Sequence, residues 1–364
     1  MKKNEKVILV SAAIFAGLGL VLNGIKQRES MKNDPDKRFD FDEFLKTGFL
    51  WGIGGGIGSA ILLFLVSLGE EKEIDQEDFN EVTYLKNVLS SFKMDEVDYA
   101  TISKGFEIRK ALHNNFKDIL LGKPTYQGSI PQGTALSGIS DLDIRVGFKK
   151  TSFSTLEEMY FTVLEYFENE FEDAQLVEVR QQKRSIGLIY NLLGTEVCID
   201  VVPGRRTNFI KGGNEYNLYE NANGFFDKPS RIKMNPHKQA DLGKNAFSVS
   251  KITALLKVLN EKEELPMKSV LIKELTKSAF EWNRGRLPKR IDRQLLMVMG
   301  YIRDNIENKI VFAPDNKNII LSNLLSNTQK KNIADHLDFI IQDVEKNPAN
   351  FQIYFPPKEY FFEY

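Results

Sequence analysis

The chain has 364 residues, with 49 lysines plus arginines against 50 aspartates plus glutamates, a net charge of −1 and one cysteine. A chain of this length can bury a substantial core in one large or two ordinary domains. The near-neutral charge excludes a protein whose whole surface attracts polyanions. The single cysteine excludes an internal disulfide framework, and the three scattered histidines add no metal-ligand spacing to it. Carboxylates are therefore the expected ligands of any metal ion.

Two uncharged apolar runs come first in the chain. VILVSAAIFAGLGLVLNGI lies between Lys6 and Lys26, and TGFLWGIGGGIGSAILLFLVSLG lies between Lys46 and Glu70. A helix needs about 20 predominantly apolar residues to cross the hydrocarbon core of a bilayer. The pattern predicts a two-helix transmembrane hairpin in residues 1–69, with spans at 7–25 and 47–68. A cleaved signal peptide is the alternative for the first run. Both arrangements place the rest of the chain in the cytoplasm, at the inner membrane.

The second run is rich in glycine. Small residues recur at four-residue spacing on two faces of the expected helix, through Gly52 and Gly56 and through Gly54 and Gly58. Such faces let helix backbones approach closely in lipid. We therefore expect a homo-oligomer formed through this helix. The same hairpin could also form an oligomeric pore.

The remaining chain divides by pattern into a linker and two lobes. Residues 70–83 are strongly acidic and predict a solvated linker or a helix start. Apolar residues at helical spacing predict one long helix over 96–121, which ends at the sequence GKP. Strand-like runs follow at 141–146, 185–191 and 196–202, and the pattern becomes mainly helical after residue 236. The expected class is α+β, with a mixed strand and helix lobe at 84–235, a helical lobe at 236–364 and a cleft between them.

The segment YQGSIPQGTALSGISDLDIRVGF, residues 126–148, carries the chemistry. It combines a GS turn, a GT turn and the pair Asp141 and Asp143. In a strand these two aspartates share one face, because side chains alternate with period two. Two carboxylates on one face repel each other unless a cation lies between them, and Mg²⁺ prefers carboxylate and phosphate oxygens. The backbone N–H groups of the GS turn and the Ser129 hydroxyl could hold a triphosphate.

A third acid lies further along the chain. Asp200 in TEVCIDVVPGRR is flanked by apolar residues, where a buried aspartate is costly without a partner. Arg205 or Arg206 could be that partner in a purely structural role. The combination of the GS turn, the paired aspartates and this third acid favours a metal site instead.

GSIPQGTALSGISDLD, followed by IDVVP, resembles the nucleotidyltransferases of the polymerase-β type. The resemblance is greatest to the oligoadenylate synthetases and to the bacterial cGAS/DncV-like enzymes, the CD-NTases. It covers the chain from about residue 84 to its end. Archaeal CCA-adding enzymes and divergent poly(A) polymerases carry related signatures.

The resemblance implies a role for each matching residue. Asp141 and Asp143 would hold two Mg²⁺ or Mn²⁺ ions, and Asp200 would complete the metal site beside the attacking hydroxyl. MNPHKQ, residues 234–239, resembles the family's NP-containing start of the helix that carries Lys257. A solvated lysine on an amphipathic helix is the alternative for Lys257. The residues that would bind the nucleotide and its phosphates are Gly128, Ser129, Thr134, Lys257 and Ser269.

Three functions follow as expectations. The first is a membrane-anchored nucleotidyltransferase that joins nucleoside triphosphates into a cyclic or short linear oligonucleotide signal. It would act in antiphage defence of the CBASS or Hailong type, with an effector or regulator encoded nearby. The second is a pore-forming effector whose nucleotidyltransferase-like domain senses a nucleotide. The third, nucleotide addition to RNA, lacks the basic, aromatic-rich stripe that RNA binding prefers, and no stable nucleic-acid duplex is expected as a partner.

Overall fold

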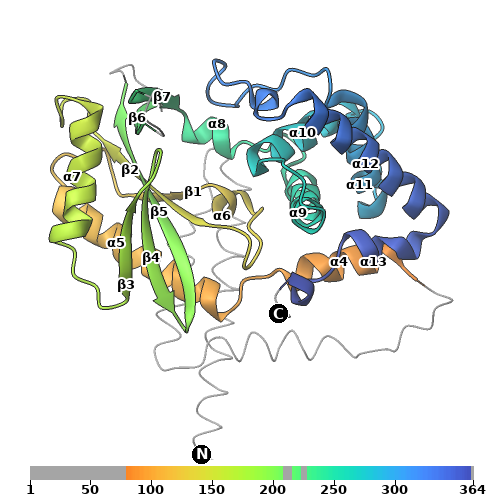
Figure 1. Cartoon of the computed structure of the whole chain (residues 1–364), viewed down its shortest axis with the longest axis horizontal. Coiled ribbons are helices and arrows are strands. Elements are labelled where there is room, and N and C mark those ends of the chain that lie inside the picture. The colour runs from red at the N-terminus through yellow and green to blue at the C-terminus, as the bar shows by residue number, and fades with distance from the viewer. Residues whose placement is uncertain (1–78, 208–214, 223–227, 362–364) are drawn as a thin grey trace, which may run out of the picture. The chain divides into compact units, whose positions relative to one another are not determined.

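The structure is a computed structural model that describes residues 79–207, 215–222 and 228–361 (Figure 1). These residues belong to one compact unit that begins at Glu77. The predicted hairpin of residues 1–69, with its spans at 7–25 and 47–68, lies outside the described residues. Within the described ranges, no helix combines the length and the apolar character that crossing a bilayer requires.

A mixed sheet of seven strands organises the first lobe of the described chain. The main order is β1-β2-β5-β4-β3, and β6 pairs with β5 and β7 with β6. The β2–β5 pair is parallel, and the other pairs are antiparallel. The strands are β1 (Thr125–Gln127), β2 (Leu142–Phe148), β3 (Leu176–Gln181), β4 (Ile186–Leu192), β5 (Thr195–Arg206), β6 (Tyr216–Glu220) and β7 (Ser230–Met234). The three predicted strands correspond to β2, β4 and β5.

Alternation along β2 decides which of its faces is buried. Leu142, Ile144, Val146 and Phe148 are buried, and the residues between them are partly exposed. The buried face packs against α5 (Glu96–Phe116), and α7 (Leu156–Asn169) covers β5 and β6 (Figure 1). Period two then places Asp143 on the opposite face of the sheet, away from these helices.

The long helix α5 ends earlier than its sequence pattern predicts. It begins with a capping box between Asp95 and Asp98 and ends at Phe116, five residues before the predicted end at residue 121. Beyond it, Leu120 forms a bridge with Phe148, and Leu121 N–H donates to the Gly147 carbonyl at 2.8 Å. Pairing with the end of β2 therefore replaces the last turn of the predicted helix.

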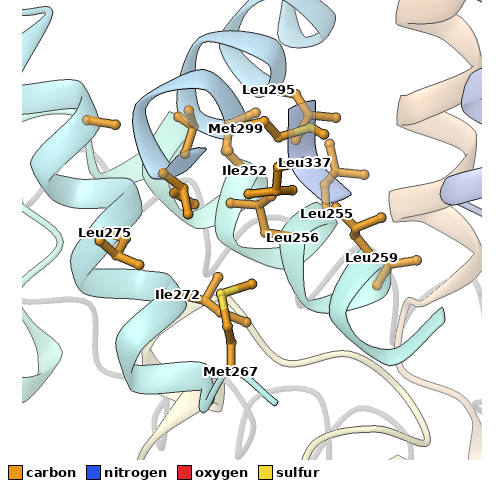
Figure 2. Packing of buried hydrophobic residues seen from close by; sticks show 14 of the residues in the cluster. Ile252, Leu255, Leu256, Leu259, Met267, Ile272, Leu275, Leu295, Met299 and Leu337 are labelled. Carbon is orange, nitrogen blue, oxygen red and sulfur yellow. The ribbon is translucent and has the colours of Figure 1, made fainter. Parts of the chain in front are cut away.

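Helices form the second lobe, as the pattern after residue 236 predicts. They are α8 (Pro236–Ala240), α9 (Ala246–Lys262), α10 (Ser269–Trp282), α11 (Ile291–Asn305), α12 (Asn327–Lys346) and α13 (Phe351–Tyr354), with the short 3₁₀ turns η1 (Leu321–Leu324), η2 (Pro348–Asn350) and η3 (Lys358–Phe361). Figure 2 shows Leu255 and Leu259 of α9 near Leu295 and Met299 of α11 and Leu337 of α12, and all five are fully buried. This apolar core holds α9 in place.

The helical core also includes a helix from before the sheet. The helix α4 (Glu81–Ser91) begins at the end of the acidic segment, where the Asn80 side chain caps it. Its buried Leu85 and Val88, with Phe92 after it, join the same cluster as α9 and α11. The chain thus passes through the helical core before it enters the sheet, which ties the two lobes together.

Candidate active site

The parallel pair β2–β5 brings two of the predicted acids side by side. Asp143 and Asp200 occupy directly paired positions in these strands. Neighbouring strands lie about 4.8 Å apart, so the two side chains leave the same face of the sheet at that spacing. Asp141 comes directly before β2. Three aspartates therefore gather where β2 begins.

A cavity of about 390 Å³ opens in front of these strands and is lined by both lobes. Asp200 is not among its lining residues. All the other predicted site residues line it: Gly128, Ser129, Thr134, Asp141, Asp143, Lys257 and Ser269. The structure thus assembles in one space residues that are up to 141 positions apart in the chain, from Gly128 to Ser269.

Gly128 brings the GS turn into contact with the metal-binding candidate Asp143. Its φ is +73°, and a Cβ built there would lie 2.3 Å from Asp143 Oδ2. A side chain at this position would displace the carboxylate. L residues also rarely adopt such a φ, so both constraints favour glycine here. Ser129 then opens the short helix α6 (Ser129–Gln132), and Thr134 N–H donates to the Ser129 carbonyl at 3.0 Å to close the turn.

Among the described residues, no positive charge fully offsets the carboxyl groups of the site. Burial, then the charges of Asp200 and Asp141, raise the pKa of Asp143 to about 7. Asp141 is more exposed, yet partial desolvation and Asp200 also raise its pKa, and Lys257 partly opposes that shift. Each influence that acts on Asp143 disfavours its ionised form. The site is therefore electrostatically prepared for a cation.

Asp200 is held by neutral neighbours on the sheet. Its Oδ2 accepts a hydrogen bond from Ser185 Oγ at 3.2 Å, and its Oδ1 accepts one from Cys198 Sγ at 3.3 Å. Burial, followed by the Asp200 charge, raises the pKa of the Cys198 thiol to about 12, so it remains a protonated donor. Arg205 donates instead to the Phe153 carbonyl. The ion pairs of the described residues include none between Asp200 and an arginine.

The carboxylates fit hard divalent cations such as Mg²⁺ or Mn²⁺. Asp141 and Asp143 offer the oxygen ligands that these ions prefer, and the missing Cβ of Gly128 leaves room for the Asp143 carboxylate. As the side chains stand, no three His, Cys, Asp or Glu residues of the described ranges form a group that could hold a metal ion. Substrate phosphate oxygens and water commonly provide the other ligands of a Mg²⁺ ion that is held by one or two carboxylates.

Lys257 lies at the junction of the two lobes. It is 7% exposed, and its Nζ donates to the Thr134 carbonyl at 3.0 Å and to Ser140 Oγ at 2.8 Å. Burial lowers its pKa to about 8, and Asp141 opposes that shift. On the same helix, Ser250 Oγ donates to the Gly133 carbonyl. α9 thus fastens the GT turn and the residue before Asp141, a set of contacts that sequence reasoning did not predict.

Other residues of the cavity also escaped prediction. Lys273 of α10 is 4% exposed, and its Nζ donates to the Gln239 carbonyl, which also accepts from Gln132 Nε2 at 3.0 Å. Asp315 comes from a hairpin beyond α11 and lines the same cavity. The NP sequence at 234–239 begins the separate short helix α8, whereas Lys257 lies on α9, which starts at Ala246, so the prediction that NP starts the helix of Lys257 is wrong. No local pattern marks Lys273 or Asp315.

Comparison with known proteins reveals similar structures but no similar sequences. No family model and no curated protein matches this chain. The Escherichia coli MS115-1 CdnC:HORMA-deltaN complex has a TM-score of 0.58 at 14% identity, covering 77% of this chain and 98% of that chain. The Bradyrhizobium diazoefficiens CD-NTase CdnG in complex with GTP has a TM-score of 0.58 at 12% identity, covering 75% and 93%. E. coli MS115-1 CdnC with ATP has a TM-score of 0.54 at 13% identity, covering 78% and 98%.

These similarities establish the fold of the described lobes. The coverage of 93–98% of the compared chains means that both the sheet lobe and the helical lobe take part. A mixed sheet with a helical second lobe is thus the fold that this chain shares with CdnC and CdnG, which confirms the α+β class predicted from the sequence.

Proposed function

We propose that this chain is a nucleotidyltransferase that joins nucleoside triphosphates into a cyclic or short linear oligonucleotide. The observation that carries the proposal is the single cavity lined by Asp141, Asp143 and the GS turn from one lobe and by Lys257 from the other. Support comes also from the fold, because similar structures have been solved with GTP and with ATP.

Each residue of the cavity has a part in binding the substrates. Asp141 and Asp143 would hold the metal ions, with Asp200 beside Asp143 on the neighbouring strand. Gly128 lies against the Asp143 carboxylate and Ser129 lines the same cavity, where the two would orient a triphosphate. When bound, two divalent ions would neutralise charge on the triphosphate and lower the pKa of the attacking hydroxyl.

The proposed reaction is one displacement at phosphorus. The oxygen of a ribose hydroxyl forms a bond to the α-phosphorus of a second nucleotide, and the bond between that phosphorus and the bridging oxygen to the β-phosphate breaks. Pyrophosphate leaves with the electron pair, and the hydroxyl proton passes to solvent or to a site carboxylate. In such transfers, most of the rate enhancement comes from positioning the reactants and stabilising the charge of the transition state. The residues around the cavity are suited to both tasks.

The test is product formation by the full-length protein in mild detergent. The four ribonucleoside triphosphates, labelled at the α-phosphate, are incubated with the protein and Mg²⁺ or Mn²⁺. Products are treated with phosphatase and separated. We expect a phosphatase-resistant product that is absent with the Asp141→Ala/Asp143→Ala double variant.

The matched control is Asp335→Ala, which removes an exposed carboxylate of α12. This variant should keep full activity. Unchanged turnover by the double variant would overturn the proposal, as would transfer of the label only onto added RNA. The second result would support nucleotide addition to RNA instead.

Signalling and membrane location are further parts of the proposal. An oligonucleotide product suits a role in antiphage defence with an effector or regulator encoded nearby. The membrane anchor is inferred only from the uncharged apolar runs in the sequence of residues 1–69. Separation of membranes from cytosol, with an alkaline wash, tests the location. Release of the protein into the cytosolic fraction would remove the anchor from the proposal without affecting the enzymatic activity.

A further inference from the structure

The cavity has an apolar part that the catalytic motifs do not explain. Two hairpins provide most of it. In the first, β6 and β7 pair so that Leu218 lies opposite Ile232, with Met234 on the same face. In the second, the Ala313 N–H donates to the Ile319 carbonyl at 2.9 Å. The apolar lining residues from these hairpins are Leu218, Ile232, Met234, Ala313, Ile319 and Leu321.

These aliphatic side chains suit the flat face of a nucleobase. Small-molecule sites combine apolar walls with a few fixed polar groups that set orientation. The carboxylates and the GS turn come from β2 and the segment before it, whereas the apolar walls come from β6, β7 and residues 311–321. The cavity therefore offers separate surfaces to the triphosphate and to the base of one nucleotide.

Asp315 is the carboxylate of the second hairpin that lines this cavity. Its Oδ2 accepts hydrogen bonds from the Asn235 backbone N–H at 3.2 Å and from Gln239 Nε2 at 2.7 Å. These two bonds fix the orientation of a half-buried side chain. The described part of the chain provides no donor to its Oδ1. That oxygen remains available to a ligand.

A fixed carboxylate discriminates among the bases by their hydrogen-bonding edges. Guanine presents two adjacent donors, N1–H and the N2 amino group. Adenine and cytosine each place a ring-nitrogen acceptor beside their amino group, and uracil flanks its single donor with two carbonyl oxygens. Charge-assisted bonds to a carboxylate are stronger than neutral ones. A wrong base would bring an acceptor against the carboxylate and leave a buried group unpaired.

We propose that this cavity binds a guanine nucleotide and that Asp315 is the residue that selects guanine. The inference rests on the proposed function, because the triphosphate end of the same nucleotide would lie at the GS turn. Gln239 connects the two ends. Its side chain holds Asp315, and its carbonyl accepts a hydrogen bond from Gln132 at the end of α6. The base and triphosphate surfaces thus share one structural support.

The first test uses the wild-type protein and measures binding, so that it does not depend on turnover. Full-length protein is titrated in Mg²⁺ with α,β-methylene triphosphates, which cannot be cleaved between the α- and β-phosphorus. The bases compared are guanine, hypoxanthine, 1-methylguanine, adenine, cytosine and uracil. We expect guanine to bind about tenfold or more better than adenine, the scale of one hydrogen bond to a charged group. Hypoxanthine, which lacks the amino group, and 1-methylguanine, which lacks N1–H, should each lose part of this preference.

The second test substitutes the carboxylate. In Asp315→Asn the amide can both donate and accept, so the preference for guanine over adenine should fall to about twofold or less, or reverse in favour of adenine. Asp315→Ala should reduce it similarly. The control is Asp335→Asn, an exposed aspartate of α12, which should keep the wild-type preference.

The two proposals fail in different ways. Guanine selectivity in binding without any phosphodiester product would contradict the proposed function and leave the base assignment standing. Product formation with equal binding of guanine and adenine, or with a preferred pyrimidine, would overturn the assignment of Asp315 alone. Retention of the guanine preference in both Asp315 variants would also overturn it.

Discussion

The acids of the sheet lobe and the lysines of the helical lobe line the same cavity, and their charges are used differently. On the sheet lobe, burial, followed by the charges of neighbouring acids, raises the pKa values of Asp141 and Asp143, and Lys257 only partly opposes the shift of Asp141. On the helical lobe, Lys257 and Lys273 are buried and already bound to protein oxygens. The helical lysines therefore hold loops in place, and Lys257 only partly offsets the charge of Asp141. Since no cation of the described residues fully neutralises these acids, we expect them to need positive charge from a bound ion.

The largest expected effect tests the acids. Asp143→Asn keeps the shape of the side chain and removes its charge, so product formation should fall on the order of 10³-fold, since several kcal/mol of charge stabilisation are lost. The measurement is the initial rate of product formation, alongside circular dichroism to confirm folding. Activity within tenfold of the wild type would mean that the sheet lobe does not need the external charge.

The next effect tests the contact between the GS turn and the acid. Gly128→Ala places a Cβ 2.3 Å from Asp143 Oδ2 at a φ of +73°. We expect a loss on the order of 10²-fold in kcat, because small displacements of positioned groups cost about this much. Gly194→Ala is the matched control, since Gly194 also has a positive φ, +82°, but nothing lies within 4 Å of its Cβ. Equal losses of kcat in the two variants would mean that backbone strain alone causes the effect.

A smaller effect distinguishes the two roles open to Lys257. Lys257→Met leaves the Thr134 carbonyl and Ser140 Oγ without their partner, so we expect a stability loss of about 1–3 kcal/mol. If the lysine fastens the loop, kcat should fall about tenfold with little change in KM. A rise in KM for the nucleotide with kcat unchanged would show instead that Lys257 binds phosphate. Lys251→Met on the same helix is the control.

The smallest effect is a pH dependence of stability in the absence of metal. The folded pKa of Asp143, about 7, lies above the ordinary aspartate value, so the folded state binds a proton that the unfolded state has released. The contribution of Asp143 to stability therefore falls as pH rises from about 4 to about 7, and it is constant above that. Thermal unfolding in EDTA between pH 5 and 8 measures it.

Asp143→Asn provides the comparison for that series. Its melting temperature should exceed that of the wild type by a few degrees at pH 8, and the difference should shrink toward pH 5. Saturating Mg²⁺ at pH 8 should raise the wild-type value and not that of the variant. If the difference in melting temperature between the wild type and Asp143→Asn does not change with pH, a group other than Asp143 binds the proton.

Sequence patterns predicted the acids better than they predicted their surroundings. Asp141 and Asp143 follow from a period of two, which is a local property of a strand. The pairing of Asp143 with Asp200 depends on which strands are neighbours, which the sequence pattern did not show, although it did group Asp200 with the two acids as a candidate metal site. Lys257 was marked by the same resemblance, but its partners Thr134 and Ser140 were not, because helix packing determines what a buried ammonium group touches.

The hairpins around the cavity could not be predicted from the sequence for a related reason. Asp315 lies 115 positions after Asp200, in a segment with no periodic pattern, and only the packing of α8 against it brings it to the cavity. The end of α5 was also predicted too late, because its last expected turn is replaced by pairing of Leu120 with Phe148. Contacts between segments that are distant in the sequence determine the structure in both places.

The register between β2 and β5 has a consequence for how this site can diverge. The backbone ladder fixes the spacing of Asp143 and Asp200. The walls that face a base belong instead to the β6–β7 hairpin and to residues 311–321. Substitutions in those hairpins can alter which nucleotide fits while the ladder keeps the acids in register. A lineage of such proteins can therefore acquire new substrates by changing peripheral hairpins and inherit its reaction unchanged from the two central strands.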